Sequence, residues 1–268
     1  MMLPDRTGVL IFAYNNSHFD YLKMAEWSTK NIHRHLDLPV TVVTDVEDTS
    51  GYDFDDVVYV PSGEPSSRHF IDIQQNVDWY NKNRVDAFNI SPYDTTIVID
   101  ADYVVASSNI RRLLYTSSDF MCHRYAYDLC FRSSLDGLNF FGQYSMPMWW
   151  ATLMIFEKTR RTEMVFDVMR MVRDHWDHYR HICEFDRSTY RNDYALSIAL
   201  NVTKHRRCTI PWNLASVLPE CKLEQEDKDA YSLTYEIDDR KMRTIVINGI
   251  DFHAMGKKDL GEIIDRSV

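Results

Sequence analysis

The chain has 268 residues, of which 45% are hydrophobic and 13% aromatic, so it can form a sizeable core and global disorder is excluded. Its formal net charge of -10 argues against a generally basic nucleic-acid-binding surface, although a local basic groove is not excluded. The odd set of five cysteines has no Cys-x-x-Cys pair, which favours free thiols in a reducing compartment over a disulfide framework or zinc cluster.

The sequence also predicts where the protein is found and how it is divided. Residues 1–6 lack the apolar stretch of a secretory signal. No apolar run approaches the roughly 20 residues that cross a bilayer, so we expect a cytoplasmic protein without a membrane span. Because no repeat, low-complexity tract or long linker interrupts the chain, we expect residues 1–268 to form a single domain.

The N-terminal part reads as a strand, a helix and a second strand. Residues 8–13 are an apolar run typical of a central parallel strand, and residues 39–45 form a second strand that ends in an acid. Between them, residues 18–36 have apolar side chains at helical spacing, with Ser17 as the expected N-cap. This βαβ unit predicts a sheet whose ligands bind beyond the carboxyl ends of the strands.

Alternating apolar and turn-prone segments follow. We expect strands at 57–60, 96–99, 119–124, 149–156 and 244–248, and helices at 70–88, 162–181 and 189–203. Residues 133–148 are rich in Gly, Asn, Ser and aromatics, which indicates a long loop near a site. The fold class is therefore α/β, with a mainly parallel central sheet flanked by helices.

The strand at 96–99 leads directly into two carboxylates, Asp100 and Asp102, with Ala101 between them. Residues two apart on an extended chain point to the same side, so both acids can aim at one point. Their repulsion is relieved by a cation, and hard oxygen ligands suit Mg²⁺ or Mn²⁺. The alternative is a solvated turn after a strand, because Asp-x-Asp also occurs by chance.

Four segments in this order resemble a glycosyltransferase of the GT-A fold, closest to the family 8-like branch typified by glycogenin and bacterial lipopolysaccharide galactosyltransferases. The segments are Gly8-Val-Leu-Ile-Phe-Ala-Tyr-Asn-Asn16, Val42-Val-Thr-Asp45, Val98-Ile-Asp-Ala-Asp102 and His253-Ala-Met-Gly-Lys257. The resemblance implies a Rossmann-like mixed sheet. It also implies a nucleotide-binding half at 1–105, ending in the Asp-x-Asp strand, and an acceptor-side half at 106–268 with the closing His/Lys segment.

The resemblance further implies how a nucleotide-sugar donor is held. His253 would complete the metal site of Asp100 and Asp102, and Lys257 would touch the donor pyrophosphate, which Gly256 lets the backbone approach. The remaining expected donor contacts are Ala13, Tyr14, Asn15, Asp45, Arg84 and Ala101. For each of these residues the alternative is structural: a core histidine, a solvated lysine, a helix cap or a turn.

Two further groups would face the sugars. Asp193, in the first turn of a helix, is the candidate catalytic carboxylate on the face of the donor sugar opposite the leaving group, or else an acid that complements the helix dipole. Trp149, Trp150 and Trp212 could form an apolar wall for the acceptor, or else are core aromatics. If Trp149 and Trp150 lie on a strand they cannot both face the core, so at least one faces solvent or ligand.

We therefore expect a metal-dependent glycosyltransferase that moves a hexose from a UDP-sugar, with retention, to an unidentified hydroxyl. A glycan is the default acceptor, with a protein or a modified DNA base as the other options; a DNA acceptor would need a basic channel that this acidic chain does not indicate. One alternative is a nucleotidyltransferase, which usually has a Gly-rich basic loop where this chain has Ala13-Tyr-Asn-Asn-Ser17. The other is a nucleotide-sugar-binding module without turnover.

Overall fold

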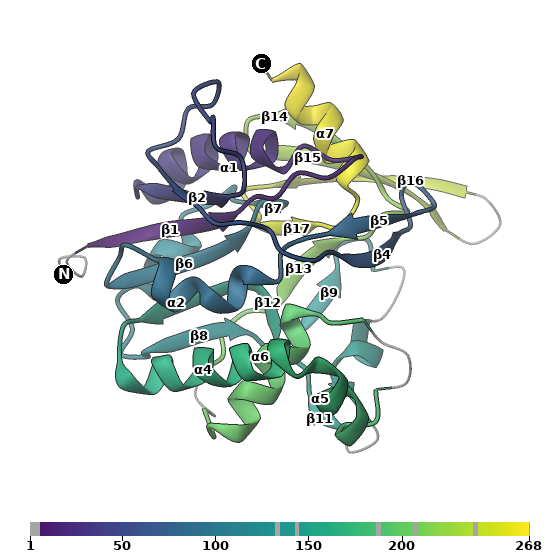
Figure 1. The fold of residues 1–268 in the computed structure, drawn as a ribbon. Helices are drawn as coiled ribbons and strands as arrows, with labels where there is room; N and C mark the ends of the chain where they lie inside the picture. Colours follow the sequence, from purple (N-terminus) through teal and green to yellow (C-terminus); the bar gives the residue numbers. More distant parts are fainter. Residues whose placement is uncertain are drawn as a thin grey trace.

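A computed structural model describes residues 6–131, 135–142, 145–185, 189–205, 208–237 and 241–267. A six-stranded sheet in the order β3-β2-β1-β6-β12-β8 forms its centre (Figure 1). Its strands are β1 (Thr7–Phe12), β2 (Val40–Thr44), β3 (Asp56–Tyr59), β6 (Thr95–Asp100), β8 (Phe120–His123) and β12 (Trp150–Glu157). β1, β2, β3 and β6 run parallel, and β12 is antiparallel to both of its neighbours, so the predicted mixed, mainly parallel sheet is confirmed.

Helices cover both faces of this sheet, which explains why its strands are continuous apolar runs. Along β1, Val9 and Ile11 join one hydrophobic cluster while Leu10 and Phe12 join the other, as strand alternation requires. The helices α1 (Tyr21–Leu36) and α7 (Lys257–Arg266) contribute to the first cluster, and α4 (Arg160–Asp174) and α6 (Asn192–Val202) to the second. Figure 1 shows these two pairs on opposite sides of the sheet.

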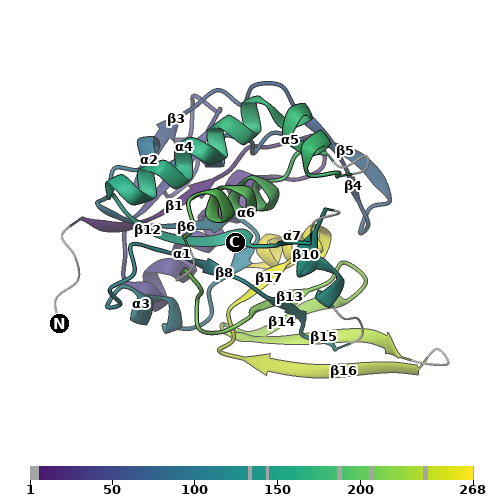
Figure 2. The ribbon, with the colours of Figure 1, turned by 90° about the horizontal axis from the view of Figure 1, so that it is seen from below.

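Smaller sheets surround the central one. A four-stranded sheet has the order β7-β17-β13-β9, and β14, β15 and β16 form an antiparallel sheet that extends away from the body (Figure 2). The strands are β7 (Tyr103–Val104), β9 (Ala126–Asp128), β13 (Leu214–Val217), β14 (Lys222–Asp227), β15 (Ala230–Ile237), β16 (Lys241–Asn248) and β17 (Phe252–Ala254). Two hairpins join β4 (Ser66–Phe70) to β5 (Gln75–Trp79) and β10 (Phe140–Phe141) to β11 (Met146–Pro147). The remaining helices are η1 (Asn83–Asp86), α2 (Ala87–Ile90), α3 (Asn109–Leu113), η2 (Leu135–Leu138) and α5 (Trp176–Ile182).

The helix expected at 70–88 is wrong. The first part of this segment is the β4–β5 hairpin, which turns back at Gln74, whose φ is +52°. Only η1 and α2 at its end are helical. Strand pairing wins because Val77 is buried and Phe70 packs on Phe19, with ring centroids 5.4 Å apart, and these tertiary contacts override the apparent helical spacing.

Other boundaries also differ from the expectation. The N-cap of α1 is Asp20, not Ser17, because an Asp20 carboxylate oxygen accepts from the Lys23 amide at 3.0 Å. The helix expected at 162–181 breaks at His175, after which the Trp176 ring stacks on Tyr194. Residues 133–148 contain the β10–β11 hairpin, although 133–134 and 143–144 lie outside the described residues. Among the described helices, not one is both long and apolar enough to span a membrane.

Candidate active site

A cavity of about 560 Å³ opens at the rim where β1 and β6 end and β12 begins. Side chains from several parts of the chain line it, among them the ends of these central strands, the β4–β5 hairpin, η1, the start of α6, and the closing segment 253–257. The parallel strands all deliver their carboxyl ends to this rim, because Phe12 of β1 lies level with Asp100 of β6 and Val43 of β2. The site therefore lies where a parallel α/β sheet places its ligands.

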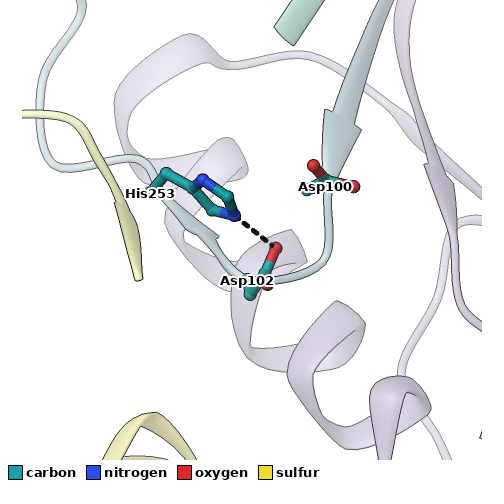
Figure 3. Close-up of side chains that lie close together, drawn as sticks. All are labelled: Asp100, Asp102 and His253. Carbon is teal, nitrogen blue, oxygen red and sulfur yellow. Dashed lines mark ion pairs between the residues drawn. The ribbon is translucent and has the colours of Figure 1, made fainter. Parts of the chain in front are cut away.

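Asp100, Asp102 and His253 meet at this rim, with one ligand atom from each lying within 4.8 Å of the others. Figure 3 shows the imidazole of His253 pointing at Asp102, with Asp100 across from them. Asp100 ends β6 and Asp102 follows in the turn before β7. His253 arrives because β17 pairs with β7, opposite Tyr103, and the Ala254 amide donates to the Asp102 carbonyl at 2.9 Å. We call these three residues the triad.

Asp102 is buried between two basic side chains. Its Oδ2 lies 2.7 Å from Nζ of Lys257, and its Oδ1 lies 3.5 Å from Nε2 of His253. Burial alone would raise the pKa of Asp102, but the charge of Lys257 and the contacts with His253 hold it well below its usual range. Burial acts to lower the pKa of Lys257, yet Asp102 outweighs it and the pKa is raised. At neutral pH the pair is therefore a carboxylate and an ammonium.

Asp100 has its own cation, Arg84, with which it forms an ion pair. Arg84 is only 2% exposed, and its Nη1 also donates to the Ala151 carbonyl at 2.9 Å. Burial lowers the pKa of Arg84 to about 10, which still leaves the guanidinium charged at neutral pH. The residue expected to contact a base or phosphate lines the cavity, but its hydrogen bonds go to Asp100 and to the peptide of Ala151.

Asp193, the expected catalytic carboxylate, bonds the backbone of the same residue, Ala151. Its Oδ1 accepts from the Ala151 amide at 2.9 Å, and its Oδ2 lies 3.0 Å from Nη2 of Arg191. The side chain of Asp193 is 14% exposed and lines the cavity. Arg84 and Asp193 thus both hydrogen bond to the backbone of Ala151, which connects the α6 side of the cavity to the triad side.

The expected donor contacts divide into two groups. Tyr14, Ala101 and Lys257 line the cavity together with Arg84. Ala13 and Asn15 do not line it: Ala13 is fully buried with its amide bonded to the Val43 carbonyl at 2.8 Å. The Asn15 side chain instead accepts from the Leu22 amide at 3.0 Å in the first turn of α1.

Asp45 and Gly256 also lie outside the lining of the cavity. Asp45 is half-buried, directly after the end of β2. Gly256 immediately precedes α7, and a Cβ added there would lie 3.2 Å from Cα of Pro219, which does line the cavity. Glycine at this position therefore allows close packing of two backbone segments, which brings Lys257 to the site.

The three tryptophans take different positions. Trp150 is 2% exposed and lines the cavity, and its Nε1 is buried without a hydrogen-bond partner among the described residues. Trp149, directly before β12, is half-buried, packs against the second hydrophobic cluster and does not line the cavity. Trp150 belongs to the first cluster, so the two side chains face opposite sides of the sheet and one of them faces the cavity, as expected. Trp212 packs against the first cluster, and its carbonyl accepts from Nδ1 of His123, away from the cavity.

Several lining residues were not anticipated from the sequence, and one group of them belongs to the β4–β5 hairpin. Arg68, Phe70, Asp72 and Trp79 all face the cavity from it. Asp72 fastens the hairpin to α7, because its Oδ2 accepts from the backbone amides of Lys257 and Lys258 at 2.8 and 3.2 Å. Residues 66–70, Ser-Ser-Arg-His-Phe, are polar up to their last position and show no apolar alternation, so the sequence does not indicate a strand there.

The triad fits a divalent cation. Two ionised carboxylates and one imidazole nitrogen converge within 4.8 Å, and oxygen donors with one imidazole suit Mn²⁺ or Mg²⁺. Lys257 and Arg84 carry the compensating positive charge at this point. Nδ1 of His253 is buried and has no hydrogen-bond partner in the described part of the chain, so Nε2 is the nitrogen that faces the acids.

No family model and no curated protein matches this sequence. Solved structures do show similarity. GlyE, a glycosyltransferase of Streptococcus pneumoniae TIGR4, matches with a TM-score of 0.46 and 11% identity over 77% of this chain and 45% of its own. The galactosyltransferase LgtC, solved with donor and acceptor sugar analogues, matches with a TM-score of 0.46 and 14% identity over 75% of this chain and 72% of its own.

The bifunctional glycosyltransferase WbbM is a further similar structure, with a TM-score of 0.40 and 14% identity over 82% of this chain and 40% of its own. This chain therefore spans less than half the length of GlyE and WbbM. At these identities and scores an activity does not transfer from one protein to another, so the function has to be argued from the cavity itself.

Proposed function

We propose that this protein is a metal-dependent glycosyltransferase that moves a sugar, a hexose by sequence resemblance, from a UDP-sugar to a hydroxyl acceptor. The observation that carries the proposal is the meeting of Asp100, Asp102 and His253 at the wall of a cavity of about 560 Å³, at the carboxyl ends of parallel strands. A cavity of this size can hold a small ligand such as a nucleotide sugar. In this proposal residues 1–105 bind the nucleotide, and residues 106–268 supply the acceptor side.

The departing diphosphate is the group that most needs stabilising. A Mn²⁺ or Mg²⁺ ion bound by the triad would neutralise charge on that leaving group. Lys257 has its ammonium 2.7 Å from Asp102, so it is close enough to move onto a phosphate oxygen once Asp102 has another partner. Arg84 would keep Asp100 oriented, because its second hydrogen bond to Ala151 anchors it to β12.

Asp193 is the residue proposed to act on the sugar. Its carboxylate is oriented by the Ala151 amide and by Arg191, and it lines the cavity beside the triad wall. A carboxylate so held can stabilise positive charge at the anomeric carbon, or attack that carbon as the diphosphate leaves. In the second case the acceptor hydroxyl would then displace the carboxylate, and the two inversions together would retain the configuration. Trp150 would provide an apolar surface for a sugar ring.

Incubation with Mn²⁺ and a panel of UDP-, GDP- and CMP-sugars tests the proposal. We expect release of the nucleotide product with one donor, and Asp102→Asn should lower it by at least about a hundredfold. This variant should still unfold cooperatively, at a lower temperature than the wild type because Lys257 loses its carboxylate partner. Asp37→Asn is the matched control, since the side chain of Asp37 is 87% exposed. Full activity in Asp102→Asn would rule out the metal-dependent mechanism.

The same assay separates the two alternatives. Release of pyrophosphate from a nucleoside triphosphate and a sugar phosphate would identify a nucleotidyltransferase. Binding of a nucleotide sugar without any product, under conditions where a range of hydroxyl acceptors is supplied, would identify a binding module. Both outcomes would contradict the transferase proposal.

A further inference from the structure

Arg68 is held in the cavity wall by contacts that do not include a carboxylate from the described residues. It lies on β4, and its guanidinium carbon is 3.4 Å from the centroid of the Trp79 ring on β5. Its Nη2 donates to the Tyr190 carbonyl at 3.2 Å, while its Nε is buried and has no hydrogen-bond partner among the described residues. A guanidinium stacked flat on an indole is preorganised to present its fork of N–H groups.

The other three arginine and lysine side chains that line the cavity each pair with a carboxylate, and Asp72, also in the lining, bonds the amides at the start of α7 instead. Arg84 pairs with Asp100, Lys257 with Asp102, and Arg191 with Asp193. Within the described ranges Arg68 has no carboxylate within ion-pairing distance. Burial lowers its pKa to about 9, and the like charge of Arg191 adds to this effect. A partly desolvated cation without a paired carboxylate is costly, so Arg68 is the position where a negative charge on a ligand would be stabilised.

The position of Arg68 shows which part of a substrate would supply that charge. The ionised side chains that act most strongly on it are Arg191 and Asp193, at the start of α6. A diphosphate held at the triad would lie beside Lys257, whereas an anion at Arg68 would lie beside the carboxylate proposed to act on the sugar. Nε of Arg191 is also buried without a hydrogen-bond partner in the part of the chain described here.

We propose that Arg68, with Arg191 beside it, forms a subsite for an oxyanion, a carboxylate or a phosphate, carried by the transferred sugar or by the acceptor. This inference rests on the proposed function, because it assigns the Asp193 side of the cavity to the sugars. The Arg68 fork binds the oxyanion through two parallel hydrogen bonds, and the Trp79 ring keeps the fork in place. The substrate class is therefore an acidic or phosphorylated sugar.

Calorimetric titration in the presence of Mg²⁺ tests the subsite with four probes. UDP-glucuronic acid is compared with UDP-glucose for the donor arm, and glucose 6-phosphate with glucose for the acceptor arm. In at least one arm we expect the anionic probe to bind the wild type about tenfold more tightly or better, as for hydrogen bonds to charged groups. Arg68→Met should reduce this ratio to about one and leave the affinity for UDP unchanged. The arm that responds identifies the source of the oxyanion.

Two results would overturn the subsite. One is the absence of any preference for the anionic probe in both arms of the wild type. The other is an equal loss of affinity for UDP and for the anionic probe in Arg68→Met, which would make Arg68 a diphosphate contact. Arg112→Met is the matched control, because Arg112 is an exposed arginine on α3 that does not line the cavity. Its substitution removes the same charge at a distance from the proposed subsite.

Folding and the proposed function are controlled separately. If Arg68→Met fails to unfold cooperatively, Arg68→Lys is used instead. It keeps the charge but loses the fork of N–H groups, so the preference for the anionic probe should fall about threefold. An unchanged preference would contradict the subsite. In Asp102→Asn, the preference for glucose 6-phosphate over glucose or for the acidic donor should persist although turnover is lost. Failure of the transferase assay together with a retained anion preference would thus reject the activity and keep the subsite.

Discussion

The two walls of the cavity are built in different ways. The triad wall stands on the ends of central strands, and each of its carboxylates has a basic partner, Arg84 for Asp100 and Lys257 for Asp102. The hairpin wall, formed by β4 and β5, is a two-stranded ribbon fastened by Asp72, and its Arg68 has no carboxylate partner among the described residues. Paired charges stabilise the triad wall in the absence of a ligand, while the hairpin wall keeps the positive charge of Arg68 available to bind a ligand.

Replacing one arginine in each wall is the strongest test of this difference between the two walls. Arg84→Met should lower the free energy of unfolding by about 4 kcal/mol, because it leaves Asp100 without its cation beside the buried strand end. Arg68→Met should change it by less than about 1 kcal/mol, because the lost cation–π contact is offset by the relief of an unmatched charge. Urea denaturation measures both, and equal losses would show that Arg68 is structural.

A fall in pH should lower the stability of the central sheet that supports the triad wall. His123 on β8 is fully buried, and burial lowers its pKa to about 4, although the hydrogen bond that it donates to the Trp212 carbonyl acts the other way. The unfolded chain takes up a proton near pH 6.5 and the folded chain near pH 4, so stability is complete above about pH 6.5 and falls as the pH drops towards 4. The loss across this window should be about 3 kcal/mol.

This pH effect is measured as the difference in unfolding free energy between the two ends of the window, for the wild type and for His123→Asn. The asparagine can still donate to the Trp212 carbonyl, but it does not titrate. Its stability should therefore depend less on pH by about the same 3 kcal/mol. An identical pH dependence in the two proteins would place the acid sensitivity elsewhere.

Lys257→Met tests whether the triad wall binds a cation. Without Lys257, Asp102 keeps only His253 as a basic neighbour, and stability without metal should fall by about 2 kcal/mol. Mn²⁺ should then raise the unfolding temperature of the variant more than that of the wild type, because the ion no longer competes with the ammonium. Thermal unfolding with and without Mn²⁺ measures this, and Lys258→Met, an exposed neighbour, is the control. A smaller rise in Lys257→Met would count against a cation site.

Asp72→Asn should have a small effect and concerns only the hairpin wall. The amide keeps one acceptor but loses the charge that faces the N-terminus of α7, at a cost of about 1 kcal/mol. Hydrogen exchange of the amides in β4 and β5 should become faster while exchange in β1 and β6 stays unchanged. Asp78→Asn, an exposed position on β5, is the control. Equal protection in the two variants would mean that other contacts hold the hairpin.

The triad was partly predictable because a local pattern marks part of it. A buried strand followed by Asp100 and Asp102 places two acids at one rim, and the structure brings them together there. Asn15 and Ala13 show the limit of that reasoning. Both lie at the same rim, but whether a residue there faces ligand or packs inward depends on the helix that follows, and Asn15 is used to bond the first turn of α1.

Arg68 was not predictable, because nothing within a few residues of it defines its role. Its position depends on the pairing of β4 with β5, on the Trp79 ring, and on the Asp72 contact with the N-terminus of α7. Local composition around 70–88 favoured a helix, and only long-range contacts reveal the hairpin. The same holds for Arg84, whose partners Asp100 and Ala151 belong to two different strands.

The amino-acid sequence by itself determined the central strands and the helices that cover them, because burial on both faces demands unbroken apolar runs and helical amphipathicity has its own period. Only the tertiary structure decided which charges meet. The pairing of β7 with β17 carries His253 to Asp102, and the docking of α7 carries Lys257 there. Such contacts join residues far apart in the chain, and no periodicity within a segment encodes them.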